Sequence, residues 1–392
     1  MSARDTIATW HQELTAIRQD FHAHPEIGFT EHRTAGIVAG LLREWGIETH
    51  EGIGGTGVVG VIRKGNGAMS IGLRADMDAL PIHEETGLAY ASKTPGVMHA
   101  CGHDGHTTML LGAARYLAQH GQFNGTVHLI FQPAEEGLGG ALAMLKDGLF
   151  ERFPCNFVYG MHNRPGLATD KFAIRPGAMM AGGGFFDITV TGRGSHGARP
   201  EGSIDPVLTA CHITAALQSI VARNVPPADT AVLSVTAIAG GDAYNVIPQT
   251  AVIRGTCRSF KHDVMDLMEA NMKRVAKGVA EGFGATAEVD FRRLFAPTVN
   301  NVECTADIAD AAASVVGEAN VERNGPSIMA SEDFSFMMER VPGAYINIGN
   351  GEVEGSCQVH NPGYNFNDAA IPTGAAMFAT LIERKLPKGV AG

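Results

Sequence analysis

The pattern of apolar segments changes twice along this 392-residue chain, and that change constrains the fold more than any other feature. Up to about residue 182, short apolar segments such as "MSIGLRADM" alternate with helical patterns, which is typical of an α/β layer with a largely parallel sheet. Between residues 184 and 294 the order becomes β-α-β-β-α-β, as in ferredoxin-like domains. After that stretch the α/β pattern returns. We therefore expect an α/β domain that is interrupted by an inserted α+β domain.

This interpretation divides the chain into three stretches. Residues 1–182 and 296–392 form the two parts of a mostly parallel-sheet domain, and residues 183–295 form the ferredoxin-like satellite domain. Apolar residues at spacings of three and four predict the main helices. The expected helices cover residues 4–22, 32–45, 105–119, 204–223, 262–282, 305–318 and 368–384.

Charge and cysteine usage narrow the class of protein. The formal net charge of −11 argues against nucleic acid or an anionic membrane surface as a partner. The sequence has no apolar run near 20 residues and no signal-peptide pattern at its start, so we expect a cytoplasmic location and no membrane span. The six cysteines are dispersed, and we expect reduced thiols. They are Cys101, Cys155, Cys211, Cys257, Cys304 and Cys357.

Polar side chains follow several of the predicted strands at the point where each strand ends. "MSIGL" leads into Arg74, Asp76 and Asp78, and "VHLIF" leads into Glu135 and Glu136; "NFVYG" likewise leads into a histidine, His162. In open α/β sheets, ligands bind beyond the carboxyl ends of the strands. Several strands are therefore expected to bring carboxylates and imidazoles to one edge of the sheet.

The segment "HACGHDGH", residues 99–106, is the densest cluster of possible metal ligands. Gly102 separates Cys101 from His103 and permits a tight backbone that lets both side chains face one ion. We expect the following helix to begin near residue 105, with Asp104 as its N-cap. A thiolate and an imidazole this close to a strand edge indicate a metal site.

Glu135 and Glu136 are neighbours, so their side chains do not easily point the same way, and two roles are natural. One carboxylate can bind metal while the other takes the proton of an attacking water. A nucleophilic pair of Cys101 with His103 or His106 does not explain why two glutamates and another strand-end histidine converge there. A zincin is excluded because the sequence contains no HExxH motif.

Taken together, the motifs resemble a known family. "GLRADMDALPI", "HACGHDGH", "QPAEEG", "GMHNRPG", "GRGSHGARP", "NVIP", "SEDFS" and H-N-P-x-Y-N span nearly the whole chain. In this order and spacing they resemble the metal-dependent aminoacylase/carboxypeptidase family of amidohydrolases, in the branch of the hippurate and indole-acetyl-amino-acid hydrolases. The resemblance implies hydrolysis of the amide bond of N-acyl amino acids with a pair of divalent ions, Zn²⁺, Mn²⁺, Co²⁺ or Ni²⁺.

The same resemblance implies roles for individual residues. The metal ligands would be Cys101, His103, Glu136, His162 and His360. Glu135 would be the general base, Asp76 would orient the metal site, and His196 would reach the active site of a partner subunit. Asn245 and Arg258 would grip the carboxylate of the substrate. Other branches carry a metal-binding histidine two residues before the aspartate, where this chain has Arg74, and the pair Cys101/His103 compensates.

From these roles we expect a homo-oligomer, at least a dimer, built through the satellite domain. A dipeptidase or p-aminobenzoyl-glutamate hydrolase of the same fold is the alternative function. A non-catalytic metal-binding protein is a further alternative, and the presence of Glu135 argues against it.

Overall fold

The computed structural model describes residues 1–351 and 357–388. The chain separates into two compact units. The first unit contains Met1–Met179, Val299–Pro326 and the chain from Asp333 onward, and the second contains Met180–Thr298 together with Ser327–Glu332. The short segment 327–332 therefore groups with the second unit, whereas the sequence analysis had left it in the α/β domain. Each unit is described separately below.

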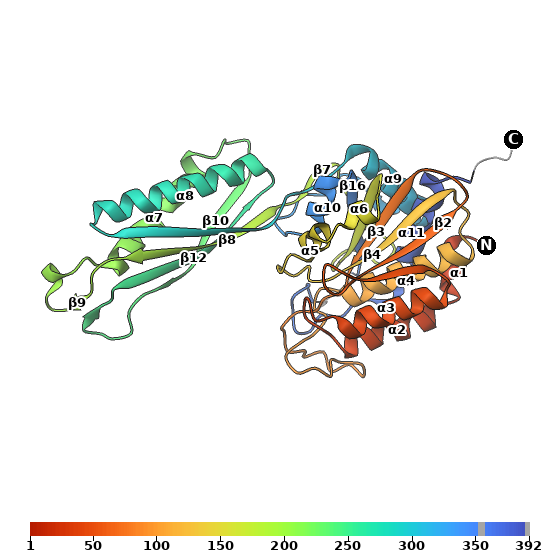
Figure 1. Cartoon of the computed structure of the whole chain (residues 1–392), viewed down its shortest axis with the longest axis horizontal. Helices are drawn as coiled ribbons and strands as arrows, with labels where there is room; N and C mark the ends of the chain where they lie inside the picture. Colours follow the sequence, from red (N-terminus) through yellow and green to blue (C-terminus); the bar gives the residue numbers. More distant parts are fainter. Residues whose placement is uncertain (352–356, 389–392) are drawn as a thin grey trace. The chain divides into compact units, whose positions relative to one another are not determined.

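The first unit is built on a sheet of eight strands in the order β1-β2-β4-β3-β5-β16-β6-β15 (Figure 1). The four central strands, β4, β3, β5 and β16, are mutually parallel, and the prediction of a mostly parallel α/β sheet is confirmed for this centre. β2 pairs antiparallel with both β1 and β4. The bounds are β1 Glu48–Ile53, β2 Gly57–Lys64, β3 Ser70–Asp76, β4 Gly125–Gln132, β5 Phe157–Arg164, β6 Phe172–Ala173, β15 Val321–Glu322 and β16 Gly343–Gly349.

Helices cover this sheet because alternate strand residues are apolar. Leu73, Leu129 and Ile346 share one buried core with the long helices α4 and α11. The helices of the first unit are α1 Ala3–Ala8, α2 His11–Ala23, α3 His32–Glu44, α4 His103–Gln119, α5 Gly140–Lys146, α6 Leu149–Arg152, α9 Val302–Val316, α10 Phe334–Arg340 and α11 Ile371–Lys385. No helix within residues 1–351 and 357–388 combines the length and apolar character that crossing a bilayer requires.

Two helix predictions are wrong in detail. The helix expected over 4–22 is two helices, because the chain breaks at Trp10, whose ring stacks on His120 and lies under the guanidinium of Arg115. Helix α4 begins at His103, and its N-cap is Gly102 rather than Asp104. Gly102 has φ +92°, and a Cβ there would lie 2.3 Å from the side-chain nitrogen of Asn163, so only glycine fits.

The second unit has the ferredoxin-like order that the sequence predicted. Its antiparallel sheet runs β10-β12-β8-β13, and α7 and α8 cover one face through a single apolar core (Figure 1). The bounds are β8 Gly182–Thr191, α7 Pro206–Arg223, β10 Ala231–Ala239, β12 Thr250–Ser259, α8 His262–Gly282 and β13 Thr286–Phe295. A short ribbon of β9 Ser195–His196 and β11 Val246–Ile247 extends beyond one end of this sheet.

Buried charges connect α2 to the first turn of α4. His22 Nδ1 lies 2.8 Å from Asp104 Oδ2, and His22 Nε2 lies 3.3 Å from Glu84 Oε1. Arg18 lies on the same buried face of α2 and contacts the same Asp104 oxygen. Burial alone would lower the pKa of His22, but the two carboxylates outweigh it and raise the pKa to about 9.

This raised pKa predicts how stability depends on pH. The His22 contribution is fully present below pH 6.5 and is lost as the pH rises through about 9, because the folded state then loses its bound proton. We expect His22→Gln to lower the free energy of unfolding by about 1–3 kcal/mol at neutral pH and by much less above pH 9. Urea titrations in chelator at several pH values measure this. His24→Gln, which affects a partly exposed contact at the end of the same helix, is the control and should show no such pH dependence. An equal loss for His22→Gln at all pH values would contradict the ion-pair account.

Candidate active site

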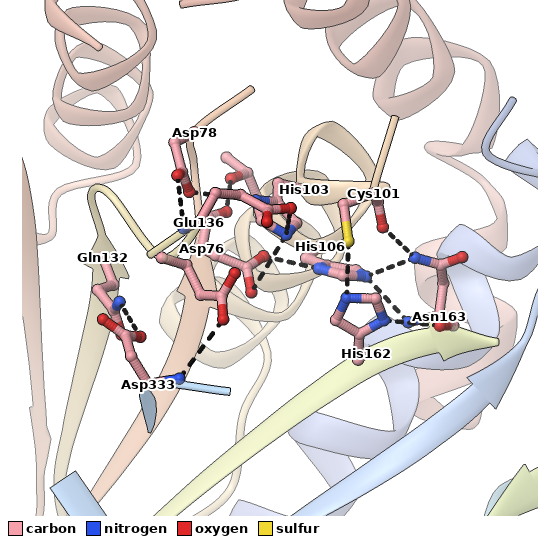
Figure 2. A network of polar contacts seen from close by, with 12 residues as sticks. Asp76, Asp78, Cys101, His103, His106, Gln132, Glu136, His162, Asn163 and Asp333 are labelled. Carbon is pink, nitrogen blue, oxygen red and sulfur yellow. Dashed lines mark hydrogen bonds and ion pairs between the residues drawn. The ribbon is translucent and has the colours of Figure 1, made fainter. Parts of the chain in front are cut away.

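The predicted ligands of the first unit converge at the carboxyl ends of three neighbouring strands. β3 ends at Asp76, β4 leads into Glu135 and Glu136, and β5 carries His162 close to its end. The turn before α4 adds Cys101 and His103 beside them (Figure 2). His360 joins from far along the chain, where its backbone N–H donates to the carbonyl of Ala100 at 2.7 Å.

The five predicted ligands form two groups that share Cys101. Cys101, His103 and His162 make one group, and Cys101, Glu136 and His360 make the other; within each, the potential ligand atoms lie within 4.8 Å of one another. Cys101 Sγ lies 3.3 Å from His162 Nε2, and His360 Nε2 lies 3.2 Å from Glu136 Oε1. Ligand atoms around one tetrahedral zinc lie roughly 3.3–3.7 Å apart, given bonds of about 2.0–2.3 Å. These two groups would therefore fit two divalent ions, and Cys101 belongs to both.

Hydrogen bonds fix which nitrogen His103 and His162 each offer. His103 Nδ1 lies 3.2 Å from Asp78 Oδ1, and His162 Nδ1 lies 2.7 Å from the carbonyl of Asn163. Each Nδ1–H donates to its oxygen, so each Nε2 keeps a free lone pair. His103 Nε2 is buried without a hydrogen-bond partner among the described residues and faces Glu136 Oε1 at 4.0 Å. A buried nitrogen in this position fits a bound cation.

Asp76 has different hydrogen-bond partners from Asp78. Its Oδ1 accepts from His106 Nδ1 at 2.6 Å, and its Oδ2 lies 3.9 Å from His103 Nε2 (Figure 2). The same Oδ2 accepts from Arg74 at 2.6 Å. His106 in turn accepts the backbone N–H of Asn163 at 2.9 Å. Asp76 and His106 thus connect the ends of β3 and β5 beneath the candidate ligands. Arg74 belongs to this network.

The electrostatics are dominated by carboxylates. Burial opposes protonation of His103, yet Asp76 and Asp78 outweigh it and raise the pKa of His103 to about 10. Burial, with Glu136 and Glu135 next in importance, also raises the pKa of the Cys101 thiol well above its ordinary value. Burial and the neighbouring His106 lower the pKa of His162. Divalent cations relieve this excess of negative charge and compete with the protons.

The sulfur, nitrogen and oxygen donors together fit a pair of divalent ions. Imidazole and thiolate donors favour zinc and other late first-row ions, while the carboxylate also tolerates manganese. Glu135 is buried beside the five candidate ligands, and the backbone N–H of Asp333 lies 3.4 Å from its Oε1. Its carboxylate groups with His103 and Glu136, which places a carboxylate next to the candidate metal site.

Comparison with known proteins decides the family. The model of the peptidase family M20/M25/M40 matches residues 72–384. The hippurate hydrolase of Campylobacter jejuni is 46% identical over 369 residues, covering 94% of this chain and 95% of that protein. The chain belongs to the M20/M25/M40 peptidase family.

Other members of the M20 family agree with this assignment. The "IAA-amino acid hydrolase ILR1-like 4" of Arabidopsis thaliana is 36% identical and covers 98% of this chain and 88% of that protein. The crystal structure of the Bacillus subtilis YXEP protein, described as a dinuclear metal-binding peptidase from the M20 family, superposes with a TM-score of 0.83. It is 32% identical and covers 97% of this chain and all of that one. The predicted resemblance is confirmed.

The remaining predicted residues of this M20 chain belong to the second unit. His196 and Asn245 lie together, because His196 pairs with Val246 in the β9/β11 ribbon and Gly197 N–H donates to the carbonyl of Asn245 at 2.7 Å. Both side chains are exposed. Arg258 is paired with Gly183 at the far end of β12. Thr250 and Arg258 are eight residue steps apart on β12, which span roughly 27 Å, so the second unit does not bring Arg258 and Asn245 together.

Three supporting residues were not singled out as site residues by the sequence analysis. Asp78 contacts His103 and accepts the backbone N–H of Glu136 at 3.0 Å, while Asn163 and His106 connect the strand ends. The sequence did point to Asp78, because it follows the end of a predicted strand. A strand-end pattern, however, cannot tell which of two aspartates contacts which histidine. No sequence pattern points to Asn163, because its role depends on packing between segments about 60 residues apart.

The contacts of Asp78 predict its contribution. We expect Asp78→Ala to lower the affinity for divalent ions about 10- to 100-fold, because His103 loses the acceptor that fixes its ring and Glu136 loses a backbone anchor. Isothermal titration calorimetry on chelator-treated protein measures this affinity. Glu85→Ala, an exposed carboxylate on the same connection between β3 and α4, is the control. Ion affinity within twofold of wild type for Asp78→Ala would show that Asp78 does not support the metal ligands.

Proposed function

We propose that this chain hydrolyses the amide bond of N-acyl amino acids, releasing a carboxylic acid and a free amino acid. The observation that carries the proposal is the convergence of five sulfur, nitrogen and oxygen donors from four separate segments beside the buried carboxylate of Glu135. The names of its relatives support the substrate class, since hippurate and indole-acetyl-amino acids are both N-acyl amino acids.

The proposed metal ligands are Cys101, His103, Glu136, His162 and His360. Two divalent ions held there would polarise the scissile carbonyl and make a water molecule acidic enough to lose a proton near neutral pH. The burial of His103 and Cys101, together with the surrounding carboxylates, supports this ligand set.

Glu135 is the proposed general base and acid. Its carboxylate takes one proton from the attacking water as the new C–O bond forms, and it returns that proton to the amide nitrogen as the C–N bond breaks. The amine then leaves neutral and the acyl group leaves as a carboxylic acid. Its buried position next to Glu136 supports a role in proton transfer for Glu135 while Glu136 binds metal.

His196, Asn245 and Arg258 are the proposed contacts to the substrate. An imidazole at His196 would stabilise the negative oxygen that develops on the attacked carbonyl, and the Arg258 guanidinium suits the carboxylate of the amino acid. Asn245 would bind the same carboxylate. Arg258 lies at one end of β12, roughly 27 Å from Thr250 at the other end, and Asn245 lies beyond Thr250 beside the β9/β11 ribbon, so one chain cannot supply both to one carboxylate.

We therefore propose a dimer with composite active sites, in which His196 and Asn245 come from the partner subunit. The second unit supports this, since it exposes several apolar side chains and an edge strand, β10, that can pair across a two-fold axis. These exposed side chains are Leu208, Ile238, Tyr244 and Val246. We also propose a cytoplasmic location, which the six free, dispersed cysteines support.

The test of function is a panel of N-acetyl, N-benzoyl and indole-acetyl amino acids with Zn²⁺, Mn²⁺, Co²⁺ and Ni²⁺. We expect Glu135→Gln to keep its metal and fold but to lose on the order of 10²–10⁴ in kcat, because it cannot move the proton. Glu136→Gln should instead lose metal, as measured by elemental analysis. Full activity in protein shown to be metal-free would refute the mechanism. A preference for free dipeptides or p-aminobenzoyl-glutamate would favour the alternative function.

Mixing two inactive variants tests the composite site. His196→Ala and Glu135→Gln homodimers should both be nearly inactive, while a mixed dimer contains one site with an intact Glu135 and a partner His196. With full subunit exchange, half the dimers are mixed and each has one working site of two, so activity should approach about a quarter of wild type. No recovery after exchange verified by native mass spectrometry would contradict the role across subunits, and a fully active His196→Ala protein would remove its catalytic role.

A further inference from the structure

The segment that carries Glu135 and Glu136 has an unfavourable backbone conformation. Ala134, immediately before them, has φ +52°, in the left-handed region that alanine seldom adopts. Its carbonyl accepts the N–H of Gly140 at 3.0 Å, which closes the turn after β4. Because Glu135 follows directly, the direction of its side chain depends on the dihedral angles of Ala134. Something outside this turn must hold Ala134 in place.

Glu31, which is the N-cap residue of α3, makes that contact. Its Oε1 accepts the backbone N–H of Ala134 at 2.8 Å, and its Oε2 accepts the hydroxyl of Thr56 at 2.5 Å. Glu31 is fully buried, and Thr56 is nearly so. In a buried setting a hydrogen bond to a carboxylate is stronger than one between neutral groups, so this contact is well suited to hold a strained residue.

Close packing of the segment before α3 brings Glu31 next to Ala134. A Cβ at Gly28 would lie 2.9 Å from the Cα of Ala134, so the two backbones touch. The carbonyl of Glu26 accepts the N–H of Ala79 at 2.8 Å, beside Asp78 at the end of β3. Residues 26–31 therefore contact both the β3 end and the turn after β4, the two places that supply the carboxylates of the site.

Three buried carboxylates accept backbone N–H groups from residues 134–141, which form the turn after β4 and the start of α5. Glu31 accepts from Ala134, Asp78 accepts from Glu136 and Asp333 accepts from Ala141. Asp78 also contacts His103, and Asp333 also contacts Gln132 and Arg74, so these two have further tasks. The Glu31 carboxylate contacts the backbone of Ala134 and the hydroxyl of Thr56. Glu31 thus acts on the site through the backbone of Ala134.

We propose that Glu31 is a positioning residue that holds Ala134 in its left-handed conformation and thereby aims Glu135 and Glu136. This inference rests on the proposed function for the roles of those two glutamates. It predicts that losing Glu31 impairs both proton transfer by Glu135 and metal binding by Glu136, without directly touching the substrate contacts.

The test compares Glu31→Leu with Glu31→Gln. Leucine cannot accept a hydrogen bond, so kcat with saturating metal should fall about 10- to 100-fold while KM changes less than about threefold. Glutamine can still accept from Ala134 through its oxygen and donate to Thr56 through its nitrogen, so its kcat should stay within about threefold of wild type. The double variant Glu31→Leu/Ala134→Gly should regain at least about threefold in kcat, because glycine adopts a positive φ without a side-chain clash.

Two further measurements do not depend on activity. Calorimetry should show about tenfold weaker binding of Zn²⁺ or Mn²⁺ to Glu31→Leu than to wild type, because Glu136 is displaced with the turn. Hydrogen exchange measured by mass spectrometry should show a loss of protection confined to the peptide around residues 131–141. Glu26→Gln is the matched control, since the Glu26 carboxylate accepts N–H groups of Arg33 and Thr34 in the same helix. This variant should lower Tm but leave kcat, metal affinity and the exchange protection of the peptide around residues 131–141 unchanged.

The outcomes separate this inference from the proposed function. If Glu31→Leu had wild-type kcat and metal affinity, the positioning role of Glu31 would be overturned. A loss of kcat in Glu31→Leu that the added Ala134→Gly change does not relieve would also overturn it. If the wild-type protein hydrolyses no N-acyl amino acid, the proposed function fails, while the metal affinity and the local exchange still decide the role of Glu31. Should Glu31→Leu not fold, Glu31→Asp, one methylene too short to reach both Ala134 and Thr56, is judged by the same measurements.

Discussion

Buried negative charge at the carboxyl ends of β3 and β4 is the constraint on which the rest of this structure depends. Asp76, Asp78 and Glu135 are all buried, and Glu136 lies beside them. Unpaired carboxylates in a protein interior are costly, so each must meet a donor or a cation. Much of the surrounding architecture supplies donors: Arg74 and His106 for Asp76, His103 for Asp78, and backbone N–H groups of the turn after β4. The remaining charge suits divalent ions.

Backbone strain is concentrated around this charge. Within the described residues, three residues other than glycine have a positive φ, namely Phe29, Ala134 and His360. Ala134 precedes the two glutamates, His360 is itself a proposed ligand, and Phe29 lies in the segment that packs against Ala134. Strained residues persist only where their surroundings hold them. Here hydrogen bonds from the Ala134 N–H to Glu31 and from the His360 N–H to the carbonyl of Ala100 supply that support.

The inserted ferredoxin-like unit carries the candidate substrate contacts, whereas the candidate metal ligands lie in the other unit. The first unit gathers candidate soft and hard metal ligands at strand ends, whereas the second unit carries an exposed imidazole and an exposed amide on a short ribbon, and a guanidinium at the far end of β12. This separation is the reason for the proposed dimer, because a two-fold axis can bring opposite ends of two copies to one substrate.

The sequence by itself determined the parallel sheet centre, the inserted β-α-β-β-α-β unit and the cluster of Cys101, His103, Glu136 and His162, because periodicity and strand-end position are local properties of the chain. It could not place the start of α4 at His103, since that depends on Gly102 meeting Asn163, which lies in β5. Nor could it assign Asp78 to His103 or Glu31 to Ala134, as these pairs are 25 and 103 residues apart. Only the tertiary structure decided them, because a buried carboxylate takes whichever donor the packing brings within reach, and no local pattern encodes that donor.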